Sequence, residues 1–205
     1  MRIPYATRSG VRWPRQVTAD FPSIDPASVA LTIDDGPTVY TREILAALDT
    51  HRVRATFFVV GELVCRRPNV VVEIVERGHN VGIHGWTHTR FPQLSESELR
   101  SEIQRTQDVL PVRATMVRPP YGDLDEDTLN VLSDEGLHVV GWSVHAEDWI
   151  ESRPRADLAR EIVKDVGQGD IVLVHDLAGA TQILDSVLPT IVSRGLVWRQ
   201  LIVEG

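Results

Sequence analysis

Two pairs of residues in the sequence could together hold a metal ion and activate water. His84 and His88 lie four residues apart, and Asp34 and Asp35 are adjacent, after an apolar run and before a Gly-Pro pair. Neutral imidazole and carboxylate are both good ligands for zinc. Taken alone, the histidines fit a surface loop and the aspartates fit a turn. Together, they favour one acid that binds a metal with both imidazoles and a second acid that acts as a base.

Three further clusters of ionisable side chains also follow apolar runs directly. The five clusters are Asp34-Asp35-Gly36-Pro37, His84-Gly85-Trp86-Thr87-His88, Arg118-Pro119-Pro120-Tyr121-Gly122, His145-Ala146-Glu147-Asp148-Trp149 and His175-Asp176. In a parallel barrel the carboxyl ends of the strands meet on one face, where such barrels carry their active sites. The sequence therefore predicts that the five clusters converge.

Apolar, β-rich runs alternate with segments of helical period after an irregular opening at residues 1–25. The predicted strands are Val29–Ile33, Ala55–Val60, Asn80–Ile83, Ala114–Val117, Leu137–Trp142, Ile171–Val174 and Val197–Val203. The predicted helices are Thr41–His51, Asn69–Arg77, Ser95–Val109, Glu126–Glu135, Arg155–Val166 and Thr181–Arg194. The third of these helices begins with Ser95 and Glu98, which have the spacing of a capping box.

Continuous apolar strands joined by helices indicate a parallel sheet that is buried on both faces. An open doubly wound sheet usually carries a glycine-rich phosphate loop, and the sequence contains neither GxGxxG nor GxxxxGK[ST]. A closed barrel fits better. We therefore predict an α/β fold, a distorted (β/α) barrel with about seven parallel strands, in a single catalytic domain over residues 1–205.

The composition narrows the classes of partner. The chain has 21 Lys+Arg and 29 Asp+Glu, a net charge of −8, which disfavours nucleic acid and anionic membrane surfaces. The single cysteine, Cys65, excludes an internal disulfide and a thiolate zinc cage, and we expect it to be a small buried residue. The opening residues do not read as a signal peptide, so we expect a cytoplasmic protein, or a secreted one if the chain is a trimmed form. The oligomeric state stays open.

The five clusters, in this order and at these separations, resemble the five signature motifs of the polysaccharide deacetylases, carbohydrate esterase family 4. The matching stretches are TIDDGP, HGWTH, RPPYG, the EDW of HAEDW, and LVHD, which run from Thr32 to Asp176. The resemblance implies a distorted (β/α) barrel and a zinc-dependent deacetylase. A site of one carboxylate and two imidazoles also accepts other divalent ions such as Co²⁺.

The resemblance also implies a role for each matching residue. The metal ligands would be Asp35, His84 and His88. The catalytic residues would be Asp34 as general base, His175 as general acid, and Arg118 and Asp148, which would orient them. The substrate-binding residues would be Tyr121, through a backbone N–H to the oxyanion, with Trp149 and Leu173 around the acetyl methyl group. Trp86 would add an aromatic face of the kind that stacks on sugar rings.

The chain departs from the family pattern at three positions. Ile33 replaces an aromatic residue, which is a change of packing. Gly85 replaces a serine or threonine, and the lost hydroxyl removes a loop hydrogen bond worth about 1 kcal/mol. His145 replaces the first aspartate of the fourth motif, and we expect it to alter substrate contacts without abolishing activity, because Asp148 is retained. Three other histidines fit structural or solvated positions, namely His51, His79 and His138.

These residues predict an amidohydrolase that releases acetate from an acetylated amino sugar in an oligosaccharide, polysaccharide or glycoconjugate. The expected cytoplasmic location favours a soluble oligosaccharide or a small glycoconjugate. A first alternative is a deacylase of a natural product or another non-carbohydrate amide, which His145 and the short chain suggest. A second is a metal- or carbohydrate-binding domain without turnover, which is disfavoured because a binding domain needs no acid–base set.

Overall fold

The computed structural model describes residues 28–202, and the predicted irregular segment at residues 1–25 lies outside that range. Seven strands form one sheet in the described part of the chain, in the order β5-β4-β3-β2-β1-β6, with β7 paired to β1. The strands are β1 (Ser28–Gly36), β2 (Thr56–Val59), β3 (Asn80–Ile83), β4 (Met116–Val117), β5 (His138–Val139), β6 (Ile171–His175) and β7 (Val197–Trp198). All the strand pairs are parallel, as predicted.

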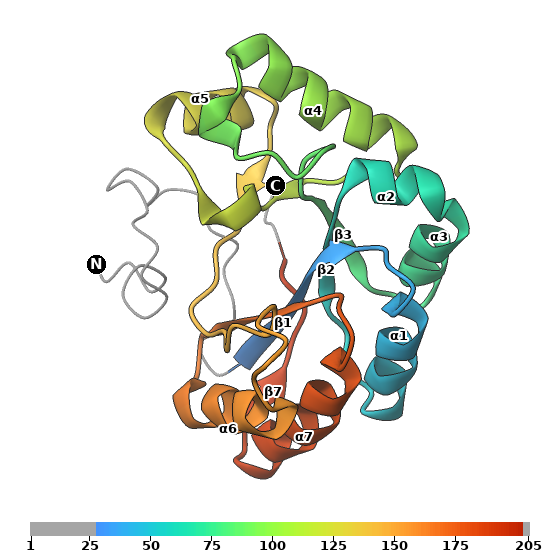
Figure 1. Ribbon diagram of the computed structural model, residues 1–205, viewed down its shortest axis with the longest axis vertical. Helices are drawn as coiled ribbons and strands as arrows, with labels where there is room; N and C mark the ends of the chain where they lie inside the picture. Colours follow the sequence, from blue (N-terminus) through green and yellow to red (C-terminus); the bar gives the residue numbers. More distant parts are fainter. Residues whose placement is uncertain (1–27, 203–205) are drawn as a thin grey trace.

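Helices cover the outside of the curved sheet. They are α1 (Thr41–Thr50), α2 (Gly61–Arg66), α3 (Pro68–Glu76), α4 (Glu96–Val109), α5 (Glu126–Asp134), α6 (Arg155–Asp165) and α7 (Ala180–Ser193). Figure 1 shows α4 and α5 at the top, α1 to α3 on the right, and α6 and α7 at the bottom. The predicted capping box is present, because Ser95 and Glu98 each bind the other's backbone N–H at the start of α4. No helix in residues 28–202 combines the length and the apolar character needed to cross a bilayer.

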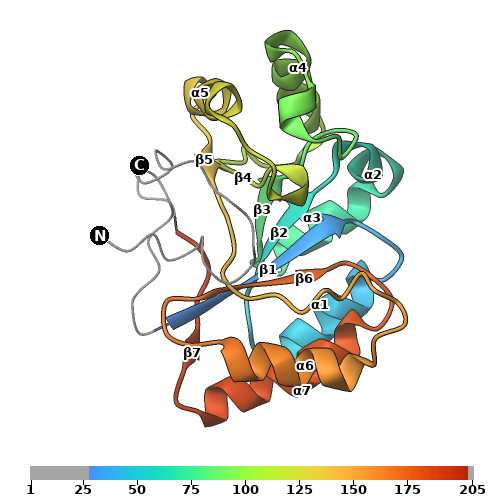
Figure 2. The same ribbon diagram turned by 60° about the vertical axis from the view of Figure 1, so that its left-hand side comes forward.

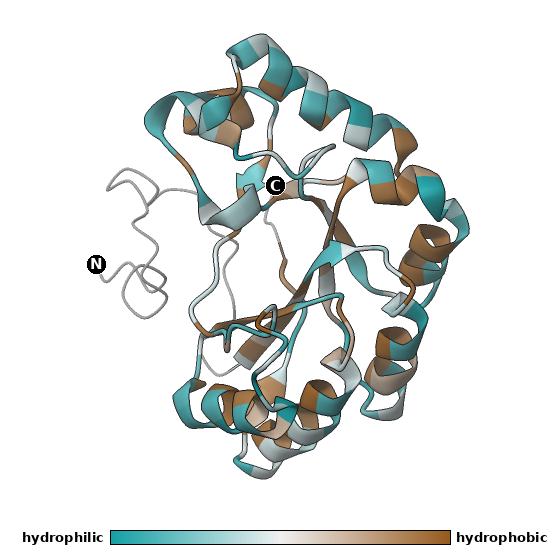
Figure 3. Cartoon of the chain, in the orientation of Figure 1, coloured by the Kyte–Doolittle hydropathy of each residue, from teal (hydrophilic) through white to brown (hydrophobic). Residues whose placement is uncertain are grey.

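Alternate residues of the strands pack on opposite faces of the sheet. Leu31, Ile33 and Phe57 belong to one buried cluster, whereas Ala30 and Phe58 belong to a second. In Figure 3 the strands and the inner sides of the helices are brown, and the outer sides of the helices are mostly teal. Burial on both faces explains why the strands read as continuous apolar runs.

The barrel is closed by a single crossing segment, residues 140–144. The backbone N–H of Val140 donates to the carbonyl of Val117, the last residue of β4, at 2.8 Å. Four residues later, Val144 forms a parallel bridge with Val172 of β6. The segment therefore spans the gap between the two edges of the sheet, and Figure 2 shows it as the gold coil that descends from β5 toward β6. The predicted distorted (β/α) barrel is confirmed, and this crossing is one source of its distortion.

The crossing also explains why one of the predicted strands was too long. Predicted strand Leu137–Trp142 pairs only at His138–Val139, because its second half leaves β4 to reach β6. The sequence prediction also missed α2, which is only six residues long and lies between β2 and Pro68. The helix leaves Cys65 exposed to solvent, so the expectation of a buried cysteine was wrong.

Candidate metal centre and active-site cleft

The carboxyl ends of the strands surround a cleft of about 580 Å³. All five predicted clusters contribute to it or to its supporting wall. The predicted site residues that line the cleft are Asp34, Asp35, His84, His88, Tyr121, His145, Trp149, Leu173 and His175. Arg118 and Asp148 lie behind them, buried, and bind two of the lining residues. Convergence of residues far apart in the sequence is thus present as predicted.

Asp35, His84 and His88 bring three ligand atoms together within 4.8 Å of one another. Oδ1 of Asp35 lies 3.3 Å from Nε2 of His84 and 3.1 Å from Nε2 of His88. Ligand atoms bound to a tetrahedral zinc ion at about 2.0–2.2 Å lie roughly 3.3 Å from one another. The spacing of the three atoms therefore fits one small divalent cation.

The hydrogen bonds around these atoms also favour a cation. Nδ1 of His84 lies 2.7 Å from the carbonyl oxygen of Arg118, so in the neutral ring Nδ1 carries the proton and Nε2 offers a lone pair. That lone pair faces Oδ1 of Asp35, a buried oxygen with no hydrogen-bond partner among the described residues. Two electron pairs in this arrangement repel unless a cation lies between them. A carbonyl contact to the second ring nitrogen is typical of metal-binding histidines.

Asp34 lies on the inner face of β1 and is held by Arg118. Its Oδ1 accepts a 2.7 Å hydrogen bond from Nη1 of Arg118, and both side chains are almost completely buried. The guanidinium also donates to the hydroxyl of Thr32 and to the carbonyls of Val140 and Gly141, at 2.7–3.0 Å. Arg118 therefore fixes the carboxylate and ties the crossing segment to β1.

His175, at the end of β6, is held by Asp148 on the opposite side of the cleft. Nδ1 of His175 lies 2.7 Å from Oδ1 of Asp148, and the other carboxylate oxygen accepts the backbone N–H of His175 at 2.7 Å. Burial by itself lowers the pKa of His175. The hydrogen bond and charge of Asp148, with the charges of Asp34 and Asp35, outweigh burial and raise that pKa to about 9. The imidazole is therefore held in its protonated form at neutral pH.

Backbone strain is concentrated around the cleft. Five residues other than glycine in the described chain have positive φ, and four of them, Asp35, His88, Tyr121 and Glu147, line the cleft. A left-handed backbone at such residues costs of order 1–3 kcal/mol each and persists only where neighbouring structure enforces it. Two of the four are metal-ligand candidates, so the strained backbone is used to aim ligating side chains.

Exposed aromatic rings form the mouth of the cleft. The indole of Trp149 is 48% exposed and stacks on His145, with ring centres 5.5 Å apart. Across the cleft, Tyr121 is 54% exposed, and its ring lies 4.7 Å from that of His88. The guanidinium of Arg90 sits 4.1 Å above the ring of Tyr121. Exposed aromatic faces with nearby polar groups are suited to sugar rings.

The structure corrects the prediction for Trp86. Its ring does not line the cleft but packs against Gly61 at the start of α2, where a Cβ atom would come within 2.4 Å of it. The guanidinium of Arg105 on α4 covers the ring at 4.1 Å. Trp86 therefore anchors the loop of the two histidines to the helices, outside the lining of the cleft.

Comparisons with known proteins agree with this geometry. A family model described as "Polysaccharide deacetylase" matches residues 23–140. The chain is 33% identical over 179 residues to a peptidoglycan-N-acetylglucosamine deacetylase of Bacillus cereus, with 82% of this chain and 65% of the relative covered. It is 35% identical over 156 residues to a chitooligosaccharide deacetylase of Sinorhizobium fredii, covering 73% of this chain and 72% of the relative. The chain belongs to the polysaccharide deacetylase family, carbohydrate esterase family 4.

Solved structures of the family have the same fold but not always the activity. One of them is a pseudoenzyme of carbohydrate esterase family 4 from Bacillus anthracis. It matches with a TM-score of 0.80 and 26% identity, over 85% of this chain and 64% of that one. Family membership implies a divalent metal site, and the carboxylate and two imidazoles described above form a group that could hold the ion. Whether a family member turns over substrate depends on its residues, because a fold does not by itself specify a function.

Sequence reasoning assigned no role to Asp176, although it lies within the fifth motif of the family. Its carboxylate is completely buried and accepts hydrogen bonds from the hydroxyls of Thr38 and Thr41, both at 2.6 Å. Its backbone N–H donates to the carbonyl of Asp34 at 2.9 Å. Asp176 therefore holds the loop that follows Asp35. The signal that could have identified Asp176 from the sequence is its position directly after a buried strand.

Two charged residues of the cleft, Arg90 and Glu147, were also missed as lining residues. Arg90 follows the second motif by two positions, and its Nη1 is 3.1 Å from Oδ2 of Asp123. Glu147 lies inside the fourth motif and is paired with Arg153 at 3.3 Å. Only their closeness to motif residues pointed to them, because charged loop residues are normally solvated.

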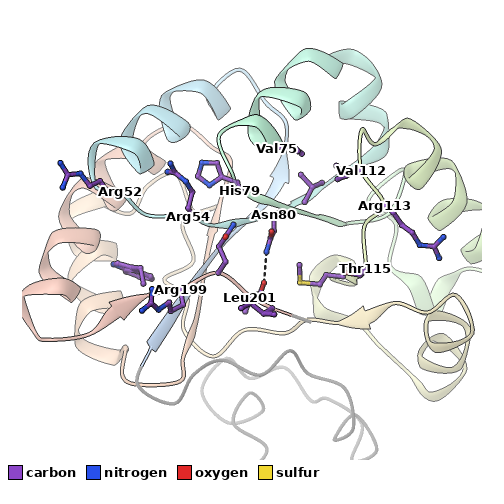
Figure 4. A pocket seen from close by; sticks show the side chains of 15 residues that line it. Arg52, Arg54, Val75, His79, Asn80, Val112, Arg113, Thr115, Arg199 and Leu201 are labelled. Atoms are coloured by element: carbon purple, nitrogen blue, oxygen red, sulfur yellow. Dashed lines mark hydrogen bonds between the residues drawn. The ribbon is translucent and has the colours of Figure 1, made fainter. Parts of the chain in front are cut away.

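A larger cavity, of about 880 Å³, lies at the opposite end of the barrel of this family member. Its lining includes four arginines and no acidic residue. The guanidinium of Arg54 is paired with Asp49 at 3.0 Å. Figure 4 shows that Arg52 and Arg113 extend to opposite sides, away from the middle of the cavity. Since these cations do not converge, the cavity does not present a compact binding site.

Proposed function

We propose that this protein is a zinc-dependent amidohydrolase that removes an N-acetyl group from an acetylated amino sugar. One observation carries the proposal. The three ligand atoms of Asp35, His84 and His88 lie in the same cleft as the buried carboxylate of Asp34 and the imidazole of His175. Metal-assisted hydrolysis of an amide uses a cation, a base and an acid around one bond.

Asp35, His84 and His88 would hold the cation. A bound divalent ion makes water more acidic and polarises the amide carbonyl, which supplies a nucleophile near neutral pH. Zinc is our choice because two imidazoles and one carboxylate, with a position left open, form a familiar catalytic zinc set. Other divalent ions, including Co²⁺, suit the same donors.

Asp34 would act as the general base and take a proton from the attacking water. Arg118 fixes this carboxylate by its 2.7 Å hydrogen bond, so the proton acceptor is in place before substrate binds. As the C–N bond breaks, His175 would give its proton to the amine nitrogen, and Asp148 supports the protonated ring. The products are acetate and a free amino sugar. A positioned acid or base contributes roughly 10²–10⁴-fold to such a reaction.

The remaining cleft residues would bind and orient substrate. The backbone N–H of Tyr121 would stabilise the oxyanion. Leu173, on the cleft floor, and the indole of Trp149 would enclose the acetyl methyl group, and the exposed rings at the mouth would contact the sugar. His145 stacks on Trp149, so it would shape the same wall and influence which sugar is accepted.

The relatives support an acetylated carbohydrate as substrate, because they are named as deacetylases of peptidoglycan and of chitooligosaccharides. The chain spans 65% of the length of the Bacillus cereus relative, so the substrate is proposed at the level of an N-acetylated amino sugar. The B. anthracis pseudoenzyme makes a protein without turnover the alternative to test. The full set of base, acid and orienting residues favours turnover here.

A substrate panel tests this proposal. The zinc-loaded protein is incubated with chitooligosaccharides, peptidoglycan fragments, acetylxylan and small N-acetyl amides, and acetate is measured, with a chelator-treated sample in parallel. We expect zinc-dependent acetate release from an N-acetylated amino sugar. Release from small amides alone would favour a non-carbohydrate substrate. Tight zinc binding with no release from any compound would favour a domain without turnover.

A further inference from the structure

The loop that carries both metal-binding histidines, residues 84–88, is held between two helices. On one side, the first amides of α2 donate to it, from Gly61 to the carbonyl of Gly85 at 3.0 Å and from Glu62 to the carbonyl of Trp86 at 3.1 Å. These are N–H groups that a helix start leaves without a partner inside the helix. The carbonyl side of the loop is therefore fixed by α2.

On the other side, the carboxylate of Glu102 on α4 accepts hydrogen bonds from N–H and O–H groups of the same loop. Its Oε2 accepts the backbone N–H of Trp86 at 2.6 Å and that of Thr87 at 2.9 Å. Its Oε1 accepts the hydroxyl of Thr87 at 2.9 Å. The peptide groups Gly85–Trp86 and Trp86–Thr87 are thus each bound on the carbonyl side by α2 and on the N–H side by Glu102 of α4. These bonds fix the backbone of the loop between the two helices.

Glu102 lies in an unusual position for a glutamate. It is only 8% exposed and sits on the buried stripe of α4 with Leu99, Ile103 and Thr106. No ion pair to Glu102 occurs within residues 28–202, so the loop donors are what offset the cost of burying its charge. The carboxylate and the loop conformation are therefore mutually dependent.

The held loop ends at a strained residue that faces the metal site. His88 has φ of 64°, and its Nε2 must stay near Oδ1 of Asp35, 3.1 Å away. Gly85 adds no side-chain hydroxyl to brace the loop, and a Cβ atom there would come 3.3 Å from Oε2 of Glu102. Without Glu102, two amides would lose their acceptor, and the strain at His88 could relax.

We propose that Glu102 is a positioning residue for the metal site, which holds His84 and His88 in their ligating geometry through the amides of Trp86 and Thr87. This inference rests on the proposed metal-dependent function. Glu102 does not touch the metal or the substrate in this role. It sets how tightly the cation is bound and with what geometry, because ligands that are already in place need no ordering when the ion arrives.

The test uses metal binding as well as activity. Glu102→Met keeps the approximate size of the side chain and removes every acceptor, whereas Glu102→Gln keeps an acceptor for both amides. Glu96→Met makes the same change as the first variant at an exposed position of the same helix. For each protein, zinc affinity is measured by competition with a chromophoric chelator, the visible absorption spectrum is recorded with Co²⁺, and thermal unfolding is followed in the metal-free state.

We expect Glu102→Met to bind zinc about 10–100-fold more weakly, the loss typical of removing a partner that orients metal ligands. Its Co²⁺ spectrum should also change. Glu102→Gln should recover most of the affinity, and Glu96→Met should match the unaltered protein. A Glu102→Met variant that unfolds at lower temperature but binds zinc normally well below that temperature would overturn the proposal, since its role would then be only structural.

Two controls keep the result interpretable. If Glu102→Met does not fold, Thr87→Val decides, because it removes the hydroxyl that Glu102 accepts at 2.9 Å, together with that hydroxyl's 2.8 Å contact with Thr89. A loss of zinc affinity of a few fold supports the proposal, and unchanged affinity overturns it. If the unaltered protein itself binds no zinc or Co²⁺, the proposed metal site fails and the inference fails with it, which separates that outcome from a failure of Glu102 alone.

Discussion

Each end of the barrel has a cavity lined partly by charged side chains, but the two ends arrange these side chains differently. At the amino end, the cavity of about 880 Å³ has arginines that extend apart, and Arg54 is paired with an acid outside the lining. At the carboxyl end, the cleft of about 580 Å³ brings three ligand atoms within 4.8 Å. Asp34 and His175, the proposed base and acid, are each held by a buried partner. The comparison shows that the candidate active site is distinguished by polar side chains whose ligand atoms lie close together, and not by the size of its cavity.

The largest effect on this comparison is expected from removing the proposed base at the carboxyl end. We expect Asp34→Asn to lower kcat by about 10²–10⁴-fold, because the water would lose its proton acceptor. The amide oxygen of asparagine can still accept from Arg118, so the fold and the binding of one metal ion should be retained. Acetate release and zinc binding measured on the same sample check both statements. Near-normal turnover would show that another group is the base.

A second change acts on the pH dependence of the acid. In Asp148→Asn, His175 loses the negative charge that helps to raise its pKa to about 9, while the burial that lowers this pKa remains. Its pKa should therefore fall, and the decline of kcat/KM as pH rises should begin at lower pH. The same pair contributes stability to the metal-free protein that is fully present below about pH 6.5, the ordinary value for histidine. That contribution is lost as pH rises through about 9.

The pH–rate profile and the unfolding midpoint of the metal-free protein, measured from pH 6 to 10, test this pair. The unaltered protein should lose part of its stability between about pH 6.5 and about pH 9, and Asp148→Asn should not show this loss. An alkaline limb at the same pH in both proteins would contradict the assignment of His175 as the acid.

The smallest effects are expected at the amino end. Arg113 and Arg199 line the larger cavity, and no hydrogen bond or ion pair of either side chain is found within residues 28–202. Arg113→Ala and Arg199→Ala should change kcat/KM by less than about twofold and the free energy of unfolding by no more than about 0.5 kcal/mol. A tenfold fall in kcat/KM for either variant would mean that this end contributes to turnover.

Sequence reasoning worked best where burial and chemistry conflict. Acids and histidines directly after apolar strands stand out because a buried strand end has no reason to carry them, and the parallel barrel then brings them together. Lengths were less predictable, since β5 ends where the chain crosses to β6, a consequence of tertiary pairing. The six residues of α2 were too few to show a helical period.

The direction in which individual side chains point was the other feature that the sequence did not predict. Trp86 lies within a motif, but its ring turns to Arg105 and α2. Cys65 lies on the solvent side of a helix that the sequence did not reveal. Glu102 offered one usable signal, because it lies three residues after Leu99 and four before Thr106, on the apolar stripe of α4. A glutamate at such a position indicates a specific partner, although the sequence does not say which loop supplies it.

Metal titration against turnover tests the central claim most directly. The protein is stripped with a chelator, zinc is returned in small steps, and acetate release from a chitooligosaccharide is measured at each step, with His88→Ala as the comparison. We predict that activity is absent after stripping, rises linearly and saturates at one zinc ion per chain, and that His88→Ala stays nearly inactive at the same zinc concentrations. Full activity in the stripped protein, or normal restoration in His88→Ala, would contradict the account.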